Sequence, residues 1–324
     1  MAVEYMLKCI PYLFDFSNVG DDEYRENIIA AAVILRQYEE IEKDDENDDT
    51  EGYESAGMPN HQTHRTSFLA VTQGIIDNCA SFPTFASETL ANATFWIAVR
   101  QEVYECFIHK RSPTMKFALY DMGPVSPANR LVMHAAEVTK WNWGEKTYGE
   151  WIRLNEEHAI LKRQFQSALC AVWEIGPDVV GGRVYPEIWY TSDAQVVSAQ
   201  HLELARMILV AEKPSVCPTV TTRPSSSSSA TQRKAEAAAR RKVEAEVRRI
   251  ILRLCGIAFS NSKCMPALVS AMMGISLYGD YFTNEQDRMC LLQIFDKIDN
   301  THAWPTSRQR LQLLEEWRAI DSTL

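Results

Sequence analysis

The stretch NATFWIAVRQEVYECFIHKRSP, from Asn92 to Pro113, contains the pattern that decides the fold. Its apolar residues recur every three or four positions, with charged residues between them, and the run closes at Pro113. This spacing is typical of an amphipathic α-helix that buries one aromatic face and leaves the other face in water. The stretch therefore predicts a helix in the core of the protein, and its pattern indicates no catalytic function.

The same periodicity recurs along the chain and predicts an all-α fold, a large helical bundle or solenoid-like domain. Ser126 followed by Pro127 is a typical helix start, with an N-cap residue and proline at the first helical position. The best strand candidate is RVYPEIWY, in which Pro186 argues against a central strand. We expect helices at Glu23–Ile41, Thr66–Cys79, Glu88–Lys110, Pro127–Trp143, Tyr148–Ala171, Ser192–Val210, Ala235–Phe259, Cys264–Ser276, Glu285–Ile298 and Ser307–Ile320.

The composition excludes some classes of function. The chain has 324 residues, of which 46% are hydrophobic and 23% are charged, as is ordinary for a globular protein. The formal net charge of −10 argues against broad, unaided nucleic-acid binding, which needs a basic surface. No run approaches the ~20 apolar residues of a membrane-spanning helix. The first residues, MAVEYMLKCIPYLFDF, are a poor signal peptide, so we expect the nucleus, with the cytosol as the alternative.

The cysteines and the short motifs of the chain indicate no chemistry. Eight cysteines are scattered, mostly inside apolar helical runs, and no two form a Cys-x-x-Cys motif. Such cysteines predict buried free thiols rather than disulfides or structural zinc. The sequence also lacks a phosphate-binding glycine loop, a Gly-x-Ser-x-Gly elbow and a His-Glu-x-x-His motif. We therefore expect no enzyme activity, and no cofactor or metal bound by this chain.

Two polar segments organise the chain into blocks. Residues 1–22 form an N-terminal extension, and residues 23–213 form the first helical block. Within this block the acidic run at 39–65 predicts a disordered loop, with an acidic activation segment as the alternative. A Ser/Pro/Thr-rich linker at 214–234 leads to the C-terminal helical block at 235–324.

The helix expected after this linker has one basic face. An apolar stripe lies on one side of QRKAEAAARRKVEAEVRRIILRLCGIA, and Arg and Lys gather on the other. The basic face comprises Arg240, Arg241, Lys242, Arg248 and Arg249. A solvated helix surface is the simplest interpretation, and nuclear import or contact with an acidic partner is the alternative.

Few side chains have a spacing that suggests a catalytic or metal site. His134 and Glu137 share a helix face, as ligands do in four-helix carboxylate sites, but the second pair that such sites need is not evident. A surface or capping histidine explains His134 better. The tryptophans fit core packing better than a pocket wall, although several can serve both purposes. The glutamates available to a helical enzyme are Glu102, Glu105, Glu137, Glu156 and Glu157, and the pattern forces none of them inward.

Several stretches resemble, in the same order, the fungal-specific transcription factor domain. They include WIAVRQEVYECFIHKR, SPANRLVMHAAEVTKW, GRVYPEIWYTSDAQVVSAQHLELARMILV and MMGISLYGDYFTNEQDRMCLLQIFDKIDNTHAWPT. This domain is the regulatory region of zinc binuclear cluster transcription factors, and the chain is similar in particular to the acriflavine-sensitivity-type branch. The resemblance covers about residues 27–306. The core of the family motif is carried by Trp96, Arg100, Gln101, Tyr104, Asn129, Arg130, Pro186, Trp189, Gln200, Gly256, Asp280, Trp304 and Pro305.

The resemblance implies a regulatory domain that controls transcription in the nucleus through protein partners. These partners are transcriptional proteins or a second subunit in a homodimer or heterodimer, and a small effector is a further candidate. Family members usually carry an N-terminal cluster of six closely spaced cysteines that binds zinc and contacts DNA, whereas Cys9 stands alone here. We therefore expect zinc and DNA contact only where such a cluster precedes this sequence. The alternatives are a helical metal- or carboxylate-dependent enzyme of specialised metabolism and a plain helical scaffold.

Overall fold

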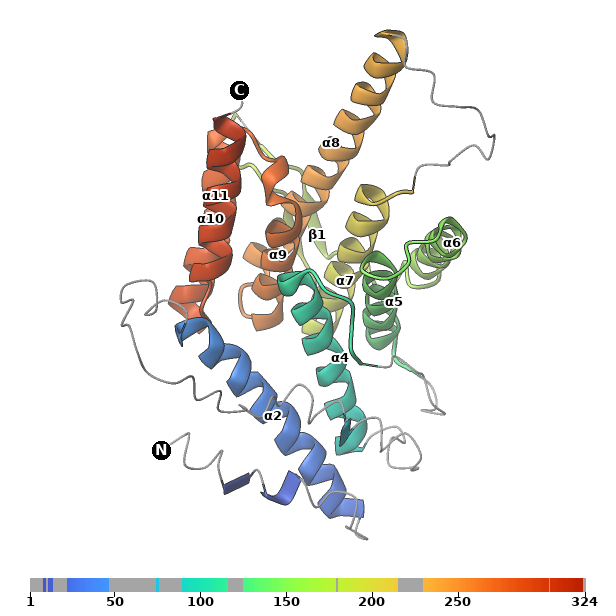
Figure 1. The fold of residues 1–324 in the computed structure, drawn as a ribbon, viewed down its shortest axis with the longest axis vertical. Coiled ribbons are helices and arrows are strands. Elements are labelled where there is room, and N and C mark those ends of the chain that lie inside the picture. The colour runs from blue at the N-terminus through green and yellow to red at the C-terminus, as the bar shows by residue number, and fades with distance from the viewer. Residues whose placement is uncertain are drawn as a thin grey trace, which may run out of the picture.

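The computed structural model of the chain is an assembly of helices with one small sheet (Figure 1). It describes residues 8–9, 11–13, 22–46, 74–75, 89–115, 125–178, 180–214, 230–302 and 304–322. The named elements are α2 (Asp22–Glu46), α4 (Leu90–His109), α5 (Pro127–Asn142), α6 (Tyr148–Gln164), β1 (Trp173–Ile175), β2 (Glu187–Trp189), α7 (Asp193–Ala211), α8 (Ala230–Ser260), α9 (Met265–Tyr278), the 3-10 helix η3 (Gly279–Tyr281), α10 (Glu285–His302) and α11 (Ser307–Asp321). This confirms the all-α fold that the periodicity predicts.

The two polar segments are shorter than the composition suggests. Residues 39–46, expected in the acidic loop, continue α2 instead, because their glutamates and lysine are good helix formers. Residues 230–234, expected in the linker, are the first turn of α8, and Ala, Gln, Arg and Lys favour helix there as well. The rest of these segments, 47–65 and 215–229, lies outside the described residues.

Two other predicted helices need comment. The helix predicted at Tyr148–Ala171 is wrong at its C-terminal end, because α6 stops at Gln164 and residues 165–169 form turns that lead toward β1. The helix predicted at Thr66–Cys79 lies outside the described residues, apart from 74–75. None of the helices within the described ranges has an apolar stretch sufficient to cross a lipid bilayer.

Helix α7 lies at the centre of the fold. It contacts α5, α6, α8 and α9, while α4 contacts α2, α5 and α9. In Figure 1, α10 and α11 lie together at one edge of the molecule, and α5 and α6 lie at the other. One apolar core includes residues from both predicted blocks, such as Phe95 and Val99 on α4 and Ile250 and Leu254 on α8. The helices before and after residues 215–229 therefore share one core.

Helix α4 has well-defined ends and a buried charge in its middle. The Thr89 side chain caps the helix by accepting a hydrogen bond from the Asn92 N–H at 3.1 Å. The helix ends at Lys110, which adopts the left-handed conformation with φ 49°. Between these ends Glu102 is completely buried, although the sequence pattern does not force it inward.

Three neighbours satisfy the buried Glu102 carboxylate. Arg36 of α2 donates to it at 3.0 Å, Arg111 donates at 3.1 Å, and the Thr114 N–H donates at 2.7 Å. Burial alone would raise the pKa of Glu102, but the Thr114 N–H and the two arginines outweigh burial and lower the pKa. Glu102 therefore joins α2, α4 and the segment after α4 as a charged group.

Replacing Glu102→Gln should destabilise the fold. The substitution removes the negative charge beside Arg36, whose side chain is 3% exposed, and breaking a buried ion pair costs about 3–5 kcal/mol. Urea unfolding measures the loss, and Glu156→Gln, at an exposed position of α6, is the matched control expected to change stability little. Equal stability of the two variants would contradict a structural role for the Glu102 charge.

The small sheet is attached to the C-terminal end of α8. β1 and β2 pair antiparallel, and Ile188 points into the core while its neighbours do not. The Ile188 N–H donates to Ser260 Oγ at 2.9 Å, and Asn261 Nδ2 donates to the Ile188 carbonyl at 2.8 Å. Asn261 Oδ1 also accepts from the Tyr190 N–H at 3.2 Å. Polar side chains at the C-terminal end of α8 and just after it thus bond the free edge of β2.

Close packing against α8 depends on a glycine. A Cβ atom on Gly256 would lie 2.1 Å from the Pro186 carbonyl oxygen, a distance that real Cβ atoms do not show. Pro186 and Gly256, both named above for a family resemblance, are therefore in direct contact, and the segment before β2 approaches the α8 backbone directly.

Replacing Gly256→Ala should weaken this contact. We expect a loss of about 1–3 kcal/mol in the free energy of unfolding, because the added methyl group forces the backbone at Pro186 to move. Gly149→Ala in α6 is the matched control, since no atom lies within 4 Å of its added Cβ, and it should be neutral or stabilising. The packing argument is wrong if both variants unfold at the same urea concentration.

Candidate binding site

Residues that carry the family motif meet each other across helices. Arg100 on α4 donates from Nη1 to the Trp96 carbonyl at 2.7 Å and from Nη2 to Asn129 Oδ1 on α5 at 2.8 Å. Trp304 lies 200 residues after Tyr104, yet its Nε1 donates to the Tyr104 hydroxyl at 3.2 Å. The two rings are edge-to-face with centroids 5.5 Å apart. Sequence reasoning named all of these residues but none of their contacts.

Gln200 occupies the junction of three helices. It is completely buried on α7, and its Nε2 donates to the Leu254 carbonyl of α8 at 3.3 Å and to the Ala267 carbonyl of α9 at 2.8 Å. Its Nε2 therefore bonds backbone groups of both neighbouring helices, whereas its Oε1 is buried without a partner among the described residues.

Other residues named for the family resemblance lie away from the contacts made by Arg100, Trp304 and Gln200. Asp280, in η3, and Pro305 are both half-buried, and burial followed by the charge of Glu316 raises the pKa of Asp280. Arg130 is exposed, and Trp189 is exposed as well, contrary to the core packing expected of the tryptophans. Trp189 points outward because successive strand residues alternate between faces, and Ile188 takes the inner face.

A small apolar pocket lies where the motif residues of α4 meet α9. Its volume is about 260 Å³, and we call it the α4–α9 pocket. The residues that form its apolar wall are Ile97, Met265, Pro266, Val269, Met273 and Trp304. Ile97 and Met265 are about half exposed, so the pocket opens to solvent on their side. Trp304 therefore contributes both to helix packing and to a pocket wall, which are the two roles considered for the tryptophans.

The polar groups of the α4–α9 pocket include one partly buried cation. Arg100, Gln101 and His201 line it together with residues of α2 and α9. Burial lowers the pKa of Arg100 to about 10, so the guanidinium remains charged at pH 7. Burial and the charge of Arg100 lower the pKa of His201 to about 4, so this imidazole is neutral at pH 7. His201 also holds the Val197 carbonyl through Nδ1 at 2.8 Å.

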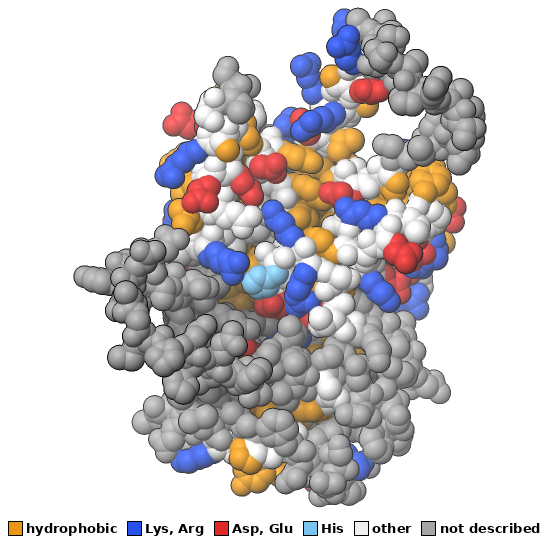
Figure 2. Space-filling model, viewed as in Figure 1, with side chains coloured by type: hydrophobic (Ala, Val, Ile, Leu, Met, Phe, Trp, Pro, Cys, Tyr) orange, Lys and Arg blue, Asp and Glu red, His pale blue; other side chains and the backbone are white. Residues whose placement is uncertain are grey.

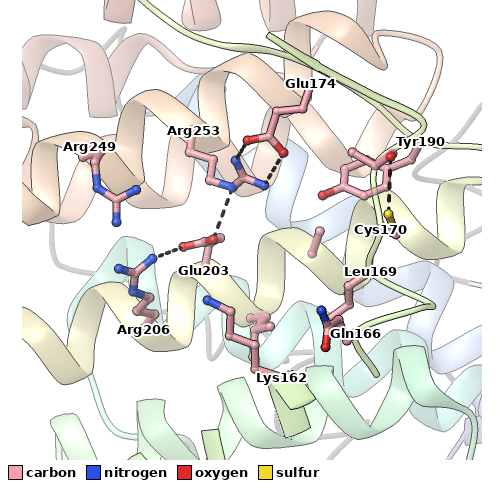
Figure 3. Close-up of a pocket in the computed structure, with 13 residues that line it drawn as sticks. Lys162, Gln166, Leu169, Cys170, Glu174, Tyr190, Glu203, Arg206, Arg249 and Arg253 are labelled. Carbon is pink, nitrogen blue, oxygen red and sulfur yellow. Dashed lines mark hydrogen bonds and ion pairs between the residues drawn. The ribbon is translucent and has the colours of Figure 1, made fainter. Parts of the chain in front are cut away.

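A second, larger hollow lies between α6, α7, α8 and the sheet (Figure 3). This α7–α8 groove has a volume of about 520 Å³, and six of its thirteen lining residues are charged. Arg253 of α8 donates to Glu174 of β1 at 3.1 Å and lies 3.3 Å from Glu203 of α7. Arg206 is 3.4 Å from the same Glu203 and also pairs with Glu246.

The two hollows differ in how their charges are balanced. The arginines of the α7–α8 groove lie against Glu174, Glu203 or Glu246, so its walls largely neutralise themselves. Arg100 in the α4–α9 pocket has only neutral acceptors, and no carboxylate of the described residues lies within 4.0 Å of it. A charge that is partly removed from water and has no counter-charge is electrostatically unfavourable. The α4–α9 pocket is therefore the better candidate for a ligand site.

The predicted basic face of α8 is divided by the fold. Arg240, Arg241 and Lys242 are exposed on the N-terminal part of α8 that projects from the body, where Lys and Arg gather (Figure 2). Arg248 instead donates to the Tyr281 carbonyl at 2.9 Å, and Arg249 is paired with Glu246 and lines the α7–α8 groove. Only the first three therefore remain as a projecting basic surface.

His134 is not the surface histidine that its spacing suggests. It is buried on α5, and its Nε2 lies 3.3 Å from Nδ1 of His158 on α6, which is buried as well. Burial, with the positive field of His158 and Arg153, lowers the pKa of His134 to about 3. Burial and the positive charges of Lys162 and Arg206 lower the pKa of His158 to about 4. The pair is therefore neutral at pH 7 and fills the space between α5 and α6.

The glutamates considered for catalysis are mostly paired with basic side chains. Glu105 contacts His109 and Arg111, Glu137 and Glu157 contact Arg153, and Glu156 is exposed. Within the described residues, no group of three or more His, Cys, Asp or Glu side chains is placed to hold a metal ion. No family model, curated protein or solved structure matches the chain.

The buried histidines predict a fold that weakens in mild acid. An unfolded histidine binds its proton near pH 6.5, whereas His134, His158 and His201 bind theirs near pH 3–4 when folded. The unfolded state therefore binds more protons as the pH falls below about 6.5, so each histidine removes up to ~1.4 kcal/mol of stability per pH unit. Urea unfolding at several pH values between about 7.5 and 5, a range that brackets the titration of an unfolded histidine near pH 6.5, measures this slope.

One variant separates the histidines from other titrating groups. His158→Gln keeps a polar partner for His134 and should reduce the slope by about a third, because one of three buried imidazoles is removed. His109→Gln is the matched control at a half-exposed position, and it should leave the slope unchanged. Identical slopes for wild type and His158→Gln would contradict the prediction.

Proposed function

We propose that this chain is the regulatory, non-DNA-contacting domain of a fungal transcription factor. It acts in the nucleus through protein partners, and a small effector bound in the α4–α9 pocket modulates this action. The observation that carries the proposal is that Arg100, Gln101 and Tyr104 from one stretch of the family resemblance line one pocket with Trp304 from another stretch. Zinc and DNA contact belong to a cysteine cluster and are not assigned to these residues.

The position of the pocket supports an effector role. Its lining residues come from α2, α4, α7 and α9 and from Trp304, between α10 and α11. A ligand that contacts all of these elements favours the arrangement in which they are packed together, and so shifts the population of the domain toward that arrangement. Coupling of this kind is typically worth about 1–3 kcal/mol, enough for a several-fold change in partner affinity.

The projecting part of α8 supports a role for protein partners. Arg240, Arg241 and Lys242 are exposed there, and this surface is complementary to an acidic partner or to a nuclear import receptor. The overall charge of −10 makes this local basic surface stand out from the rest of the chain.

A tethering experiment tests the proposed function. The chain is fused to a bacterial DNA-binding domain and a separate nuclear import signal, and a reporter gene in a fungal host measures transcription. We expect reporter output to differ several-fold from that of the DNA-binding domain alone. Changing Arg240, Arg241 and Lys242 together to alanine should reduce this difference, because the partner surface loses its charge.

The matched control changes the exposed Lys263, Arg308 and Arg318 to alanine and should keep the full difference in output. The proposal is refuted if the nuclear fusion protein gives the same output as the DNA-binding domain alone.

A further inference from the structure

We infer that the α4–α9 pocket binds a small organic acid, with its carboxylate against Arg100 and its hydrocarbon body along the wall formed by Met265, Met273 and Trp304. This names the ligand class of the proposed effector and in that respect rests on the proposed function. The binding chemistry itself is a property of the purified chain, and four observations support it.

The first observation is the bonding of Arg100. A guanidinium has five N–H groups, and two donors of Arg100 are bonded, one to the Trp96 carbonyl and one to Asn129 Oδ1. Both acceptors are neutral, and no acidic side chain of the described residues forms an ion pair with Arg100. A carboxylate is the acceptor that matches the remaining planar N–H groups and supplies the missing negative charge.

The second observation is the charge of the pocket wall. None of the described residues that line the α4–α9 pocket is acidic, and Arg100 is the single cation among them because His201 is neutral at pH 7. The pocket thus holds one uncompensated positive charge in largely apolar surroundings, where electrostatic attraction is stronger than in water. A singly charged anion balances this charge, whereas a neutral ligand leaves it unbalanced.

The third observation is an unpaired acceptor. Gln101 is 6% exposed, and its Nε2 is held by the Val33 carbonyl at 3.3 Å and by Gln37 Oε1 at 3.0 Å. These two acceptors fix the orientation of the amide, and Oε1 is then buried without a hydrogen-bond partner within the described part of the chain. A ligand hydroxyl can donate to Oε1 and remove the cost of leaving it unpaired.

The fourth observation is the size of the pocket. Its volume of about 260 Å³ lies just below the roughly 300–1,000 Å³ of pockets that take drug-sized ligands. The ligand is therefore a small molecule rather than a protein segment. An apolar wall beside a single cation favours a monocarboxylic acid with a hydrocarbon chain over a strongly polar anion such as a sugar phosphate.

Methionine NMR tests the inference on the whole chain. The protein is labelled with 13C at the methionine methyl groups and titrated with 2-hydroxyoctanoate or with 2-hydroxyoctanamide, its neutral counterpart. The signals of Met265 and Met273 should move, while those of the buried Met133 on α5 and the exposed Met289 on α10 should not. The acid should bind at least about tenfold more tightly than the amide, as expected for a charge-assisted hydrogen bond.

Three variants locate the site. Arg100→Met keeps an apolar stem and should remove the preference for the acid. Val269→Phe fills the pocket while Arg100 itself is kept, and it should remove binding of both compounds. Arg130→Met, at an exposed arginine of α5, is the matched control and should leave the preference for the acid unchanged.

The inference is overturned if the amide binds as tightly as the acid, or if the acid leaves Met265 and Met273 unmoved. Unchanged binding in Val269→Phe overturns it as well, and this variant decides the question if Arg100→Met does not fold. Failure of the two proposals can be distinguished. A chain that binds the acid but leaves the tethered reporter unchanged refutes the transcriptional role alone, and the converse result refutes the ligand alone.

Discussion

The burial of α7 among α5, α6, α8 and α9 is the constraint on which the rest of the structure depends. A helix surrounded in this way needs apolar side chains on nearly every face, and α7 has them from Val196 to Leu209. Its buried Gln200 bonds carbonyl groups of α8 and α9 and so fixes how these helices meet α7. The walls of the α4–α9 pocket follow from that arrangement, because α9 packs against both α7 and α4.

The helices of this fold could be predicted because each is encoded locally. Apolar periodicity locates them, and capping residues such as Ser126 mark their ends, as the bond from the Asn129 N–H to Ser126 Oγ at 3.2 Å shows. The pairing of helices could not be predicted in this way. Nothing within the local sequence around Tyr104 indicates that its partner is Trp304, since the contact joins residues far apart in the chain.

Buried polar residues were the systematic error, for a physical reason. Helix patterns assign charged and titratable residues to the wet face, yet Glu102 and His134 are both buried. Their partners, Arg36 and His158, come from other helices, so the compensation that permits burial is invisible locally. One signal was present for Glu102. It lies three residues after Val99 and four before Cys106, on the apolar stripe of its own helix.

The candidate pocket was only half visible in the sequence. Arg100, Gln101, Tyr104 and Trp304 could be singled out from the resemblance, but their convergence on α9 could not. His201 carried no signal, because a lone histidine in an apolar helix is ordinarily a core residue. The exposed Trp189 shows the opposite error, since an aromatic residue in a short strand is buried only when something covers its face.

The contact between Tyr104 and Trp304 also has a consequence for how the chain folds. Its sequence separation means that a loop of 200 residues must close before the last wall of the α4–α9 pocket is in place. Closing a long loop costs entropy before any contact repays it, and folds rich in such contacts form slowly. Competence to bind at this pocket should therefore be acquired late in folding and lost early in unfolding. A molecule that occupies the pocket would then favour the completed chain over every partly folded form.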